Sequence, residues 1–328
     1  MLHTTAIRQL QFSDLYLGHP SLADRFSDAR STDVIPLPES AQLRHEVEQL
    51  TQACRNTLRS MSIPSSEFKL DHDQDTYRVS VMPTNKGEMF VVRKIAQDIA
   101  TLAELGVPQA YIRQLMARDM TGLFIVAGGP KAGKTTTASA MVKDRLSAYG
   151  GVAVTTEGPI ELPLEGSHGD GICYQTVAGN DTRSFLDSFR QATRWGARMI
   201  LIHEIRDPEV AAEVLQASNN GHLIISTMLA SNVVRSVGKL HALVDKHLGG
   251  NSARALMADG LVGVMHQRLQ GLGSIRRKLE TEILLLRDAP ASKRFLREGN
   301  FDQLAYEMRH QMSSLVEENA FAMRNARG

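Results

Sequence analysis

The sequence predicts an α/β fold, in which a domain built on a mostly parallel sheet follows a smaller α+β domain. From Gly122 onward, strand-like apolar runs alternate with helical segments, which is typical of a parallel sheet covered by helices on both faces. Before that point the pattern is one amphipathic helix followed by a hairpin. With 328 residues the chain is long enough for two domains, and the change of pattern predicts residues 1–118 and 119–328.

The smaller domain is predicted from three local patterns. Apolar residues at spacings of three and four predict a helix with this stripe: Leu43, Val47, Leu50, Cys54, Leu58 and Met61. Alternating apolar residues over 77–81 and an apolar run over 89–92 flank a Gly-containing loop, which predicts a β-hairpin. A short helix is expected after Pro108.

The larger domain is predicted from the alternation of strands and helices. The expected strands are Leu123–Ala127, Val152–Thr155, Met199–His203 and Leu223–Thr227, with helices near 134–148, 183–195 and 208–219 between them. Asp207 and Pro208 suit the N-cap and first position of the third helix. Ser231 is expected to cap a further helix, and the chain beyond residue 280 is predicted to be helical.

Composition narrows the class of protein. A hydrophobic fraction of 42% and a net charge of +1 are typical of a globular chain, and argue against a dedicated nucleic-acid binder. Cys54 and Cys173 lie far apart and are interpreted as small apolar side chains in a reducing compartment. No apolar run approaches the ~20 residues that span a bilayer, and the N-terminus has no signal-peptide core. We therefore expect a cytosolic protein without a transmembrane segment.

Residues 128–135 read Gly-Gly-Pro-Lys-Ala-Gly-Lys-Thr and fit the phosphate-binding loop motif completely. The loop follows a predicted strand and precedes a predicted helix, as the motif requires. Gly128 and Gly133 let the backbone curl so that its N–H groups point at an anion. Lys134 is expected to reach the β- and γ-phosphates of ATP, and the Thr135 hydroxyl to ligate Mg²⁺, with Thr136 beside it.

Acidic residues and a histidine follow or precede the other strands of this domain. Because ligands sit outside the carboxyl ends of parallel strands, Glu157 and Glu204 should converge on the nucleotide. Glu204 is a candidate for positioning the attacking water, while Glu157 and Glu161 could polarise water or order the Mg²⁺ shell. His222 is a candidate γ-phosphate sensor. Glu161 and His222 could equally be packing or surface residues.

Taken together, these segments resemble those of the secretion and pilus ATPases, which drive type II secretion, type IV secretion and type IV pili. The matching residues are Glu157 to Glu161 except Gly158, Glu204 to Asp207, Gly221 to Leu223, Gln267 to Leu269 and the opening Ser13-Asp14-Leu15. The branch of PilT-like retraction motors looks nearest. The resemblance implies a PAS-like N-terminal domain, a RecA-like ATPase domain and a homohexamer. It also implies an inner-membrane platform protein as partner, and a place at the inner membrane through such partners.

The resemblance also points to four arginines. Arg190 and Arg194 match a pair of arginines that the family spaces four apart, and Arg78 and Arg93 fall at family positions in the first domain. A guanidinium supplied by a neighbouring subunit can neutralise transition-state charge, so these side chains are candidates for contacting phosphate.

Five departures from the family pattern leave the function open between alternatives. They are Lys131, Gly158, His203, the segment Gly196-Ala197-Arg198 in place of Asp-Pro-Asp, and Met228-Leu229-Ala230 in place of a second histidine motif. The leading hypothesis is an ATP-hydrolysing motor for pilus retraction or for a related secretion or conjugation machine. The alternatives are a catalytically weak ATP-binding ring subunit and a RecA-like nucleic-acid translocase.

Overall fold

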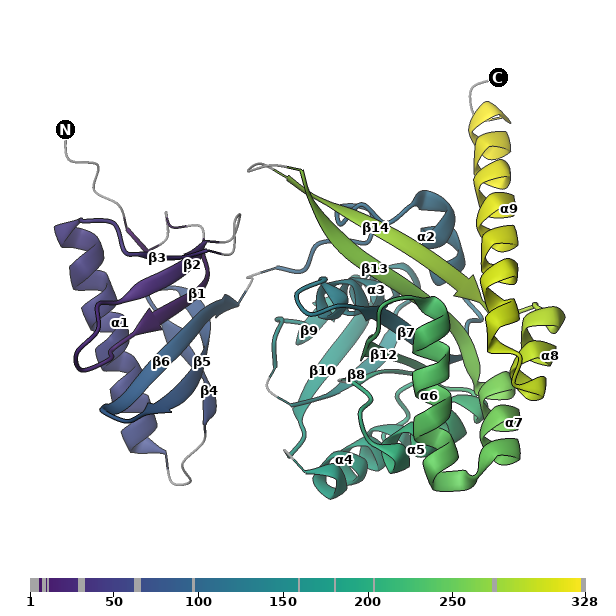
Figure 1. Ribbon diagram of the computed structural model, residues 1–328, viewed down its shortest axis with the longest axis horizontal. Helices are drawn as coiled ribbons and strands as arrows, with labels where there is room; N and C mark the ends of the chain where they lie inside the picture. The colour runs from purple at the N-terminus through teal and green to yellow at the C-terminus, as the bar shows by residue number, and fades with distance from the viewer. Residues whose placement is uncertain are drawn as a thin grey trace. The chain divides into compact units, whose positions relative to one another are not determined.

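A computed structural model describes residues 6–7, 10, 12–28, 33–61, 66–95, 98–158, 160–179, 181–202, 204–272 and 276–325 (Figure 1). For 271–272, 276–277 and 316–325 it describes the backbone alone. Contacts divide the chain into two units, and each is described by itself. The first comprises Met1–Asp98, Glu161–Pro163 and Leu272–Arg276, and the second comprises Ile99–Ile160, Leu164–Gly271 and Arg277–Gly328.

The first unit contains a six-stranded antiparallel sheet and one long helix. The strand order is β3-β2-β1-β6-β5-β4. The elements are β1 (Phe12–Leu17), β2 (Arg25–Asp28), β3 (Val34–Pro36), α1 (Ala41–Ser60), β4 (Glu67–His72), β5 (Asp75–Thr84) and β6 (Gly87–Ile95). The predicted hairpin is confirmed as β5 and β6, which pair from Thr84↔Gly87 to Thr76↔Ile95. The other four strands were not predicted: β2 and β3 have only four and three residues, while the alternation of Phe68 and Leu70 in β4 was missed.

Helix α1 holds this sheet together along its apolar stripe. The Ser40 side chain caps the helix by accepting a hydrogen bond from Leu43 N at 3.3 Å. Leu43, Leu50 and Cys54 are fully buried, so the predicted stripe is confirmed over most of its length. They pack in one cluster with sheet residues that include Leu15, Leu17, Val79, Phe90 and Val92.

The second unit is built on an eight-stranded sheet with the order β14-β13-β7-β12-β11-β8-β10-β9. The strands are β7 (Gly122–Gly128), β8 (Gly151–Glu157), β9 (Gly166–His168), β10 (Gly171–Val177), β11 (Met199–Ile202), β12 (Leu223–Leu229), β13 (Leu261–Leu272) and β14 (Arg276–Leu285). Neighbours from β13 to β10 pair in parallel, whereas β9 runs antiparallel to β10. The sheet is therefore mixed around the parallel centre that the sequence predicts.

Helices cover both faces of this sheet (Figure 1). They are α3 (Lys134–Tyr149), α4 (Thr182–Arg194), α5 (Pro208–Asn219), α6 (Val233–Leu248) and α7 (Gly250–Gly260). Leu123, Ile125 and Ala127 of β7 share one core cluster with residues of α4 to α7. Because side chains alternate along a strand, Phe124 and Val126 face the other side, where α3 packs.

Contacts place the short helix α2 (Gln109–Leu115) and the residues around it in the second unit. Leu102 N donates to Asp144 Oδ2 at 2.9 Å, and Arg145 Nη1 donates to Leu115 O at 2.6 Å. The structure thus divides the chain at 98/99 rather than at the 118/119 boundary that the change of sequence pattern suggests. The reason is that residues 99–118 bond to α3, a contact that no local pattern reveals.

Two local predictions are corrected in the second half of the chain. Asn232, not Ser231, caps α6, since its side chain accepts from Arg235 N at 2.8 Å. Residues 280–285 form the end of β14 rather than a helix, because β14 lies beside β13 in the sheet. The helices beyond this strand are α8 (Pro290–Glu298), η2 (Phe301–Gln303) and α9 (Leu304–Asn325). The Asp207 cap and Pro208 at the start of α5 are confirmed.

Among the helices of the described residues, none combines the length and apolar character needed to cross a bilayer.

Candidate nucleotide-binding site

The phosphate-binding loop lies between β7, which ends at Gly128, and α3, which begins at Lys134. Lys134 Nζ donates to Gly129 O at 2.8 Å, so this side chain lies over the loop. Gly133 has a φ of 81° and Lys131 a φ of 58°, and both values fall in the left-handed region. Because a Cβ in that region costs about 1 kcal/mol or more, a glycine at position 131, as in the family motif, would relieve the strain.

Gln267 on β13 forms the inner wall of this loop. Its side chain is fully buried, and Nε2 donates to Ala132 O at 2.6 Å. Its main-chain oxygen would lie 2.5 Å from a Cβ built on Gly128. Gln267 therefore fixes the loop from two directions, a role that its place in a familial segment did not reveal.

A methyl group at Gly128 is expected to disrupt this loop. Gly128→Ala would force the added carbon against the Gln267 main chain, which is part of a buried strand and cannot yield cheaply. We expect the free energy of unfolding to fall by about 1–3 kcal/mol, with loss of nucleotide-dependent stabilisation. Thermal melts with and without MgATP measure both effects.

Gly129→Ala is the matched control for this substitution. A Cβ at Gly129 meets no atom within 4 Å, and its φ is not in the left-handed region. Equal stability losses in the two variants would show that the Gln267 wall does not constrain the loop.

Glu204 lies beside the start of the loop. Leu229 N donates to Glu204 Oε1 at 3.1 Å, and Leu229 is the register partner of Gly128 in the adjacent strand. The Glu204 side chain is only 7% exposed, and Arg206 Nη2 lies 2.9 Å from Oε2. Lys239 Nζ on α6 lies 3.9 Å from Oε1 and donates to Leu229 O at 3.1 Å. The structure thus brings Glu204 to the loop, with two cations close to its carboxylate.

Glu157 is the second buried carboxylate at this edge. It ends β8, next to the β11 strand that leads to Glu204, and is 3% exposed. Gln175 Nε2 on β10 donates to Glu157 Oε1 at 2.9 Å, while the Gln175 amide oxygen accepts from Leu164 N and Glu165 N at 2.9 and 2.8 Å. Gln175 therefore holds the Glu157 carboxylate in place.

These donors suit a magnesium nucleotide. The Thr135 hydroxyl at the start of α3 and two carboxylates are the oxygen ligands that Mg²⁺ or its waters prefer. Lys134 and the loop amides at the helix N-terminus suit phosphate, and Thr136 follows in the first turn. Neither Gln175 nor Lys239 was predicted from the sequence, because both reach the site through tertiary contacts alone.

His222 lies at the opposite edge of the sheet. It precedes β12, its carbonyl accepts from Gly122 N, and its Nδ1 lies 3.2 Å from Ala217 O. Because Leu223 pairs with Gly122 and Leu229 with Gly128, about seven residues of strand, roughly 20 Å, separate His222 from the loop. The structure does not bring His222 to a phosphate on this chain's own loop.

Arg190 and Arg194 also lie away from the loop. Arg190 Nε and Nη2 each lie 3.1 Å from a carboxylate oxygen of Glu213 on α5. Arg194 is the last residue of α4 and is exposed. Helix α4 begins near the carboxyl ends of the strands, where the hydroxyl of its first residue, Thr182, bonds to Asp207. The two arginines lie two to three turns further along the helix, and so further from the loop.

Arg78, Arg93 and Glu161 belong to the first unit. Arg78 and Arg93 are direct partners across β5 and β6, and so lie on one face of the sheet. Arg78 pairs with Glu67 at 2.8 Å and with Glu161 at 2.7 Å, and Arg93 pairs with Asp14 at 2.7 Å. His203 and Pro159 lie outside the described residues, while Gly158 is half-buried with open space around its Cα.

Both cysteines are free and fully buried. Burial raises the pKa of the Cys54 thiol to about 12, and burial with nearby Glu165 and Glu157 does the same for Cys173. Neither thiol is a nucleophile at neutral pH, which agrees with their interpretation as packing residues.

Comparison with known proteins places this chain in a family. The family described as "Type II/IV secretion system protein" matches residues 63–309, which include the loop, Glu157 and Glu204. The twitching motility protein of Neisseria gonorrhoeae is 26% identical over 230 residues, covering 70% of this chain and 59% of that protein. Type II secretion system protein E of Klebsiella pneumoniae is 34% identical over 191 residues, which cover 56% of this chain and 37% of that protein. The chain thus spans less than two thirds of either relative.

Solved structures agree on the fold. The pilus retraction motor PilT, solved with bound ADP, superposes with a TM-score of 0.73 at 23% identity, covering 92% of this chain and 87% of that one. The ATPase DotB of Yersinia pseudotuberculosis also has a TM-score of 0.73, at 20% identity, covering 92% and 82%. With a family match over 63–309, the chain belongs to the Type II/IV secretion system protein family.

Proposed function

We propose that this chain is an ATP-hydrolysing subunit of a homohexameric motor that powers a type IV pilus, as a retraction motor, or a related secretion or conjugation machine. One observation carries the proposal. A buried carboxylate, Glu204, is fixed by Leu229 N–H next to the residue that opens the phosphate-binding loop. Binding of MgATP does not itself require a group that positions water, whereas phosphoryl transfer to water does, and Glu204 is placed to supply it.

Each residue of the site has a defined task in this proposal. Bound MgATP supplies the phosphoanhydride that is cleaved. Lys134 and the loop amides hold its phosphates, and the Thr135 hydroxyl faces the metal. Glu204 orients water, and Glu157, held by Gln175, orders the metal's water shell.

Two observations support the alternative of a catalytically weak ring subunit. Arg206 and Lys239 lie close to the Glu204 carboxylate and compete with water for its oxygens. Leu229 stands where the family motif has a histidine. Turnover measured on the assembled oligomer separates this alternative from a motor.

We further propose that the first unit is a PAS-like domain and the second a RecA-like domain. An antiparallel sheet with one helix packed on one face supports the first assignment. Parallel strands in the order β13-β7-β12-β11-β8, with the loop after β7, support the second. Arg78, Arg93, Arg190 and Arg194 are then the candidates for contacting a phosphate, some of them from a neighbouring chain. Glu161, His222 and Thr136 are proposed to complete such a shared site.

The partners follow from the same proposal. The chain assembles with itself and with an inner-membrane platform protein, which holds it at the cytoplasmic side of that membrane. Relatives with pilus and with type II secretion names occur in the same family, so the proposal covers both kinds of machine. A near-neutral net charge of +1 favours a protein partner over nucleic acid.

Phosphate release from MgATP by the full chain, with oligomer size measured by light scattering, tests the proposal. We expect turnover that requires the oligomer. Arg93→Lys keeps a cation beside Asp14 but loses the planar fork, so turnover should fall at least about tenfold at unchanged oligomer size.

Arg25→Lys is the matched control, since Arg25 is exposed on β2 of the same unit. A monomer that hydrolyses ATP as fast as the oligomer would contradict the shared site. Wild-type turnover of the Arg93→Lys variant would show that Arg93 is not part of the shared site.

A further inference from the structure

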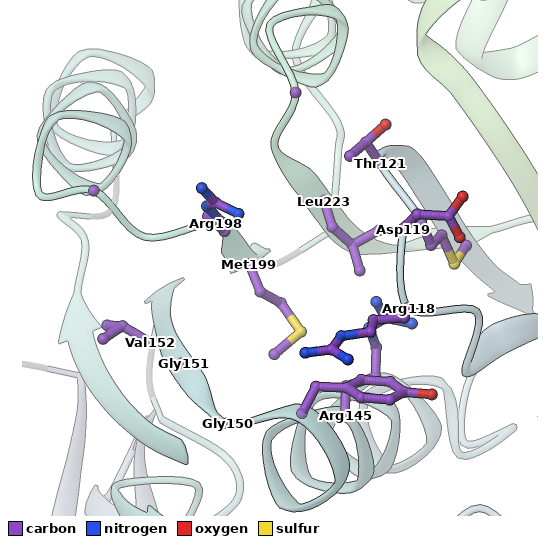
Figure 2. Close-up of a pocket in the computed structure, with 14 residues that line it drawn as sticks. Arg118, Asp119, Thr121, Arg145, Gly150, Gly151, Val152, Arg198, Met199 and Leu223 are labelled. Atoms are coloured by element: carbon purple, nitrogen blue, oxygen red, sulfur yellow. The ribbon is translucent and has the colours of Figure 1, made fainter. Parts of the chain in front are cut away.

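A pocket of about 600 Å³ opens at the edge of the second unit's sheet that lies opposite the phosphate-binding loop. The pocket lies at the amino ends of four neighbouring strands. The residues at or near these ends are Gly122 of β7, Val152 of β8, Met199 of β11 and Leu223 of β12. The pocket in Figure 2 is lined by residues of the segments 118–121, 145–152, 196–199 and 221–223. Its volume is that of a small-molecule site, which is typically about 300–1,000 Å³.

Three guanidinium groups line this pocket: Arg118, Arg145 and Arg198. Arg145 is 6% exposed, and its Nη1 donates to Leu115 O at 2.6 Å and Ala117 O at 3.0 Å. Burial lowers the pKa of Arg145. The one carboxylate in the lining, Asp119, is engaged by Arg287 Nη2 at 2.6 Å.

Arg118 and Arg198 are the available cations. Both are exposed, and within the part of the chain that the structure describes neither has an ion pair. Arginines at this edge have an ordinary structural use, because helices α3, α4 and α5 end here and their last carbonyls favour cations. Arg145 bonds to carbonyls in this way, after α2. Arg118 and Arg198 make no such bond among the described residues; Arg118 lies over the Tyr149 ring instead, and Arg198 is exposed.

The floor between these cations is apolar. Met199 is 8% and Leu223 3% exposed, and in Figure 2 the Met199 side chain lies between Arg198 and Arg118. The Tyr149 ring lies 5.9 Å from the Arg118 guanidinium carbon and 5.6 Å from that of Arg145. Both guanidinium groups lie over the ring, so Tyr149 holds cations at the pocket wall, and the apolar contact surface is that of Met199 and Leu223. This combination suits an anion that carries a planar or apolar body.

We propose that this pocket binds a small organic phosphate, with its phosphate held by Arg118 and Arg198 together and its body on Met199 and Leu223. A phosphate suits it better than a carboxylate, because a dianion gains more from several guanidinium groups. Arg198 stands where the family motif places an aspartate. The positive charge of this pocket wall is therefore a feature of this chain and not of the family motif. The site is separate from the nucleotide site and does not rest on the proposed function.

Phenyl phosphate is the probe, titrated into the full chain and followed by ligand-observed NMR. We expect saturable binding that weakens with added salt. Arg118→Ala and Arg198→Ala should each weaken it by about tenfold, the usual size of one lost charge-assisted hydrogen bond. Inorganic phosphate, which lacks the ring, and phenol, which lacks the charge, should both bind more weakly than phenyl phosphate.

Arg309→Ala is the matched control. Arg309 is exposed on α9, and its guanidinium carbon lies 4.7 Å from the Tyr306 ring centroid, which repeats the contact of Arg118 with Tyr149 outside the pocket. This variant should bind phenyl phosphate as the wild type does, and so should Lys134→Ala. Because Arg118, Arg198 and Arg309 are exposed, all three alanine variants should keep the wild-type melting temperature.

Three results would overturn the proposal. The first is the absence of saturable binding. The second is binding that Lys134→Ala removes and the two pocket variants leave intact, since the probe would then sit in the phosphate-binding loop. The third is binding that neither the pocket variants nor Lys134→Ala changes, since the probe would then bind outside both sites.

Discussion

Lys134→Ala is expected to abolish the stabilisation of this protein by MgATP. Lys134 begins α3, and its ammonium group lies over the loop, bonded to Gly129 O at 2.8 Å. In a loop of this kind, the lysine is the cation that reaches the β- and γ-phosphates. Removing it leaves the strand, the loop amides and Gln267 in place, while the charge of the nucleotide loses its counterion.

Thermal melts measure this effect. With nucleotide at about 100 times its dissociation constant, the wild type should gain about 2.7 kcal/mol, and the variant close to nothing. Without nucleotide, the variant should lose only about 1 kcal/mol, the typical net value of one hydrogen bond.

Lys131→Ala is the control from the same loop, since Lys131 is exposed. Lysine and alanine meet the same strain at this left-handed position, so the substitution leaves the backbone unchanged. It should retain most of the MgATP-dependent shift in melting temperature. An unchanged shift in Lys134→Ala would refute the assignment of residues 128–135 as the nucleotide site.

Glu204→Gln is expected to keep nucleotide binding and to lose at least about 99% of turnover. The amide has the shape of the carboxylate, and its oxygen can still accept from Leu229 N, so the edge of the sheet stays intact. It cannot accept a proton from water or orient water as strongly, and loss of such a group typically slows a reaction by about 10²–10⁴-fold. Phosphate release under saturating MgATP, with the affinity from melting shifts, separates the two effects.

Glu48→Gln provides the comparison, because Glu48 is exposed on α1 and lies outside the candidate site. It should hydrolyse ATP as the wild type does. If Glu204→Gln turned over at a near wild-type rate, Glu157 would become the candidate for positioning water. If the wild-type oligomer bound MgATP without turnover, the chain would be the catalytically weak ring subunit.

Local patterns in the sequence predicted the elements whose residues specify their own structure. The stripe of α1, the β5–β6 hairpin and the cap of α5 all depend on residues within a few positions of one another. The loop of 128–135 is of the same kind, since its strand, glycines and helix are continuous in the chain. These features were confirmed in type and close to their bounds.

The sequence by itself therefore determined an α/β chain, a strand–loop–helix segment at 122–149 that fits the phosphate-binding motif, and carboxylates after two strands. Tertiary structure alone decided what surrounds them. Gln267 and Gln175 reach the site from neighbouring strands, and Lys239 from a helix, so no spacing in the chain marks them. The strand register alone places His222 at the far edge. The physical reason is that the spacing of residues along the chain determines local hydrogen bonds and hydrophobic periodicity. The partners of a buried polar group depend instead on which strands and helices pack against it in the folded protein.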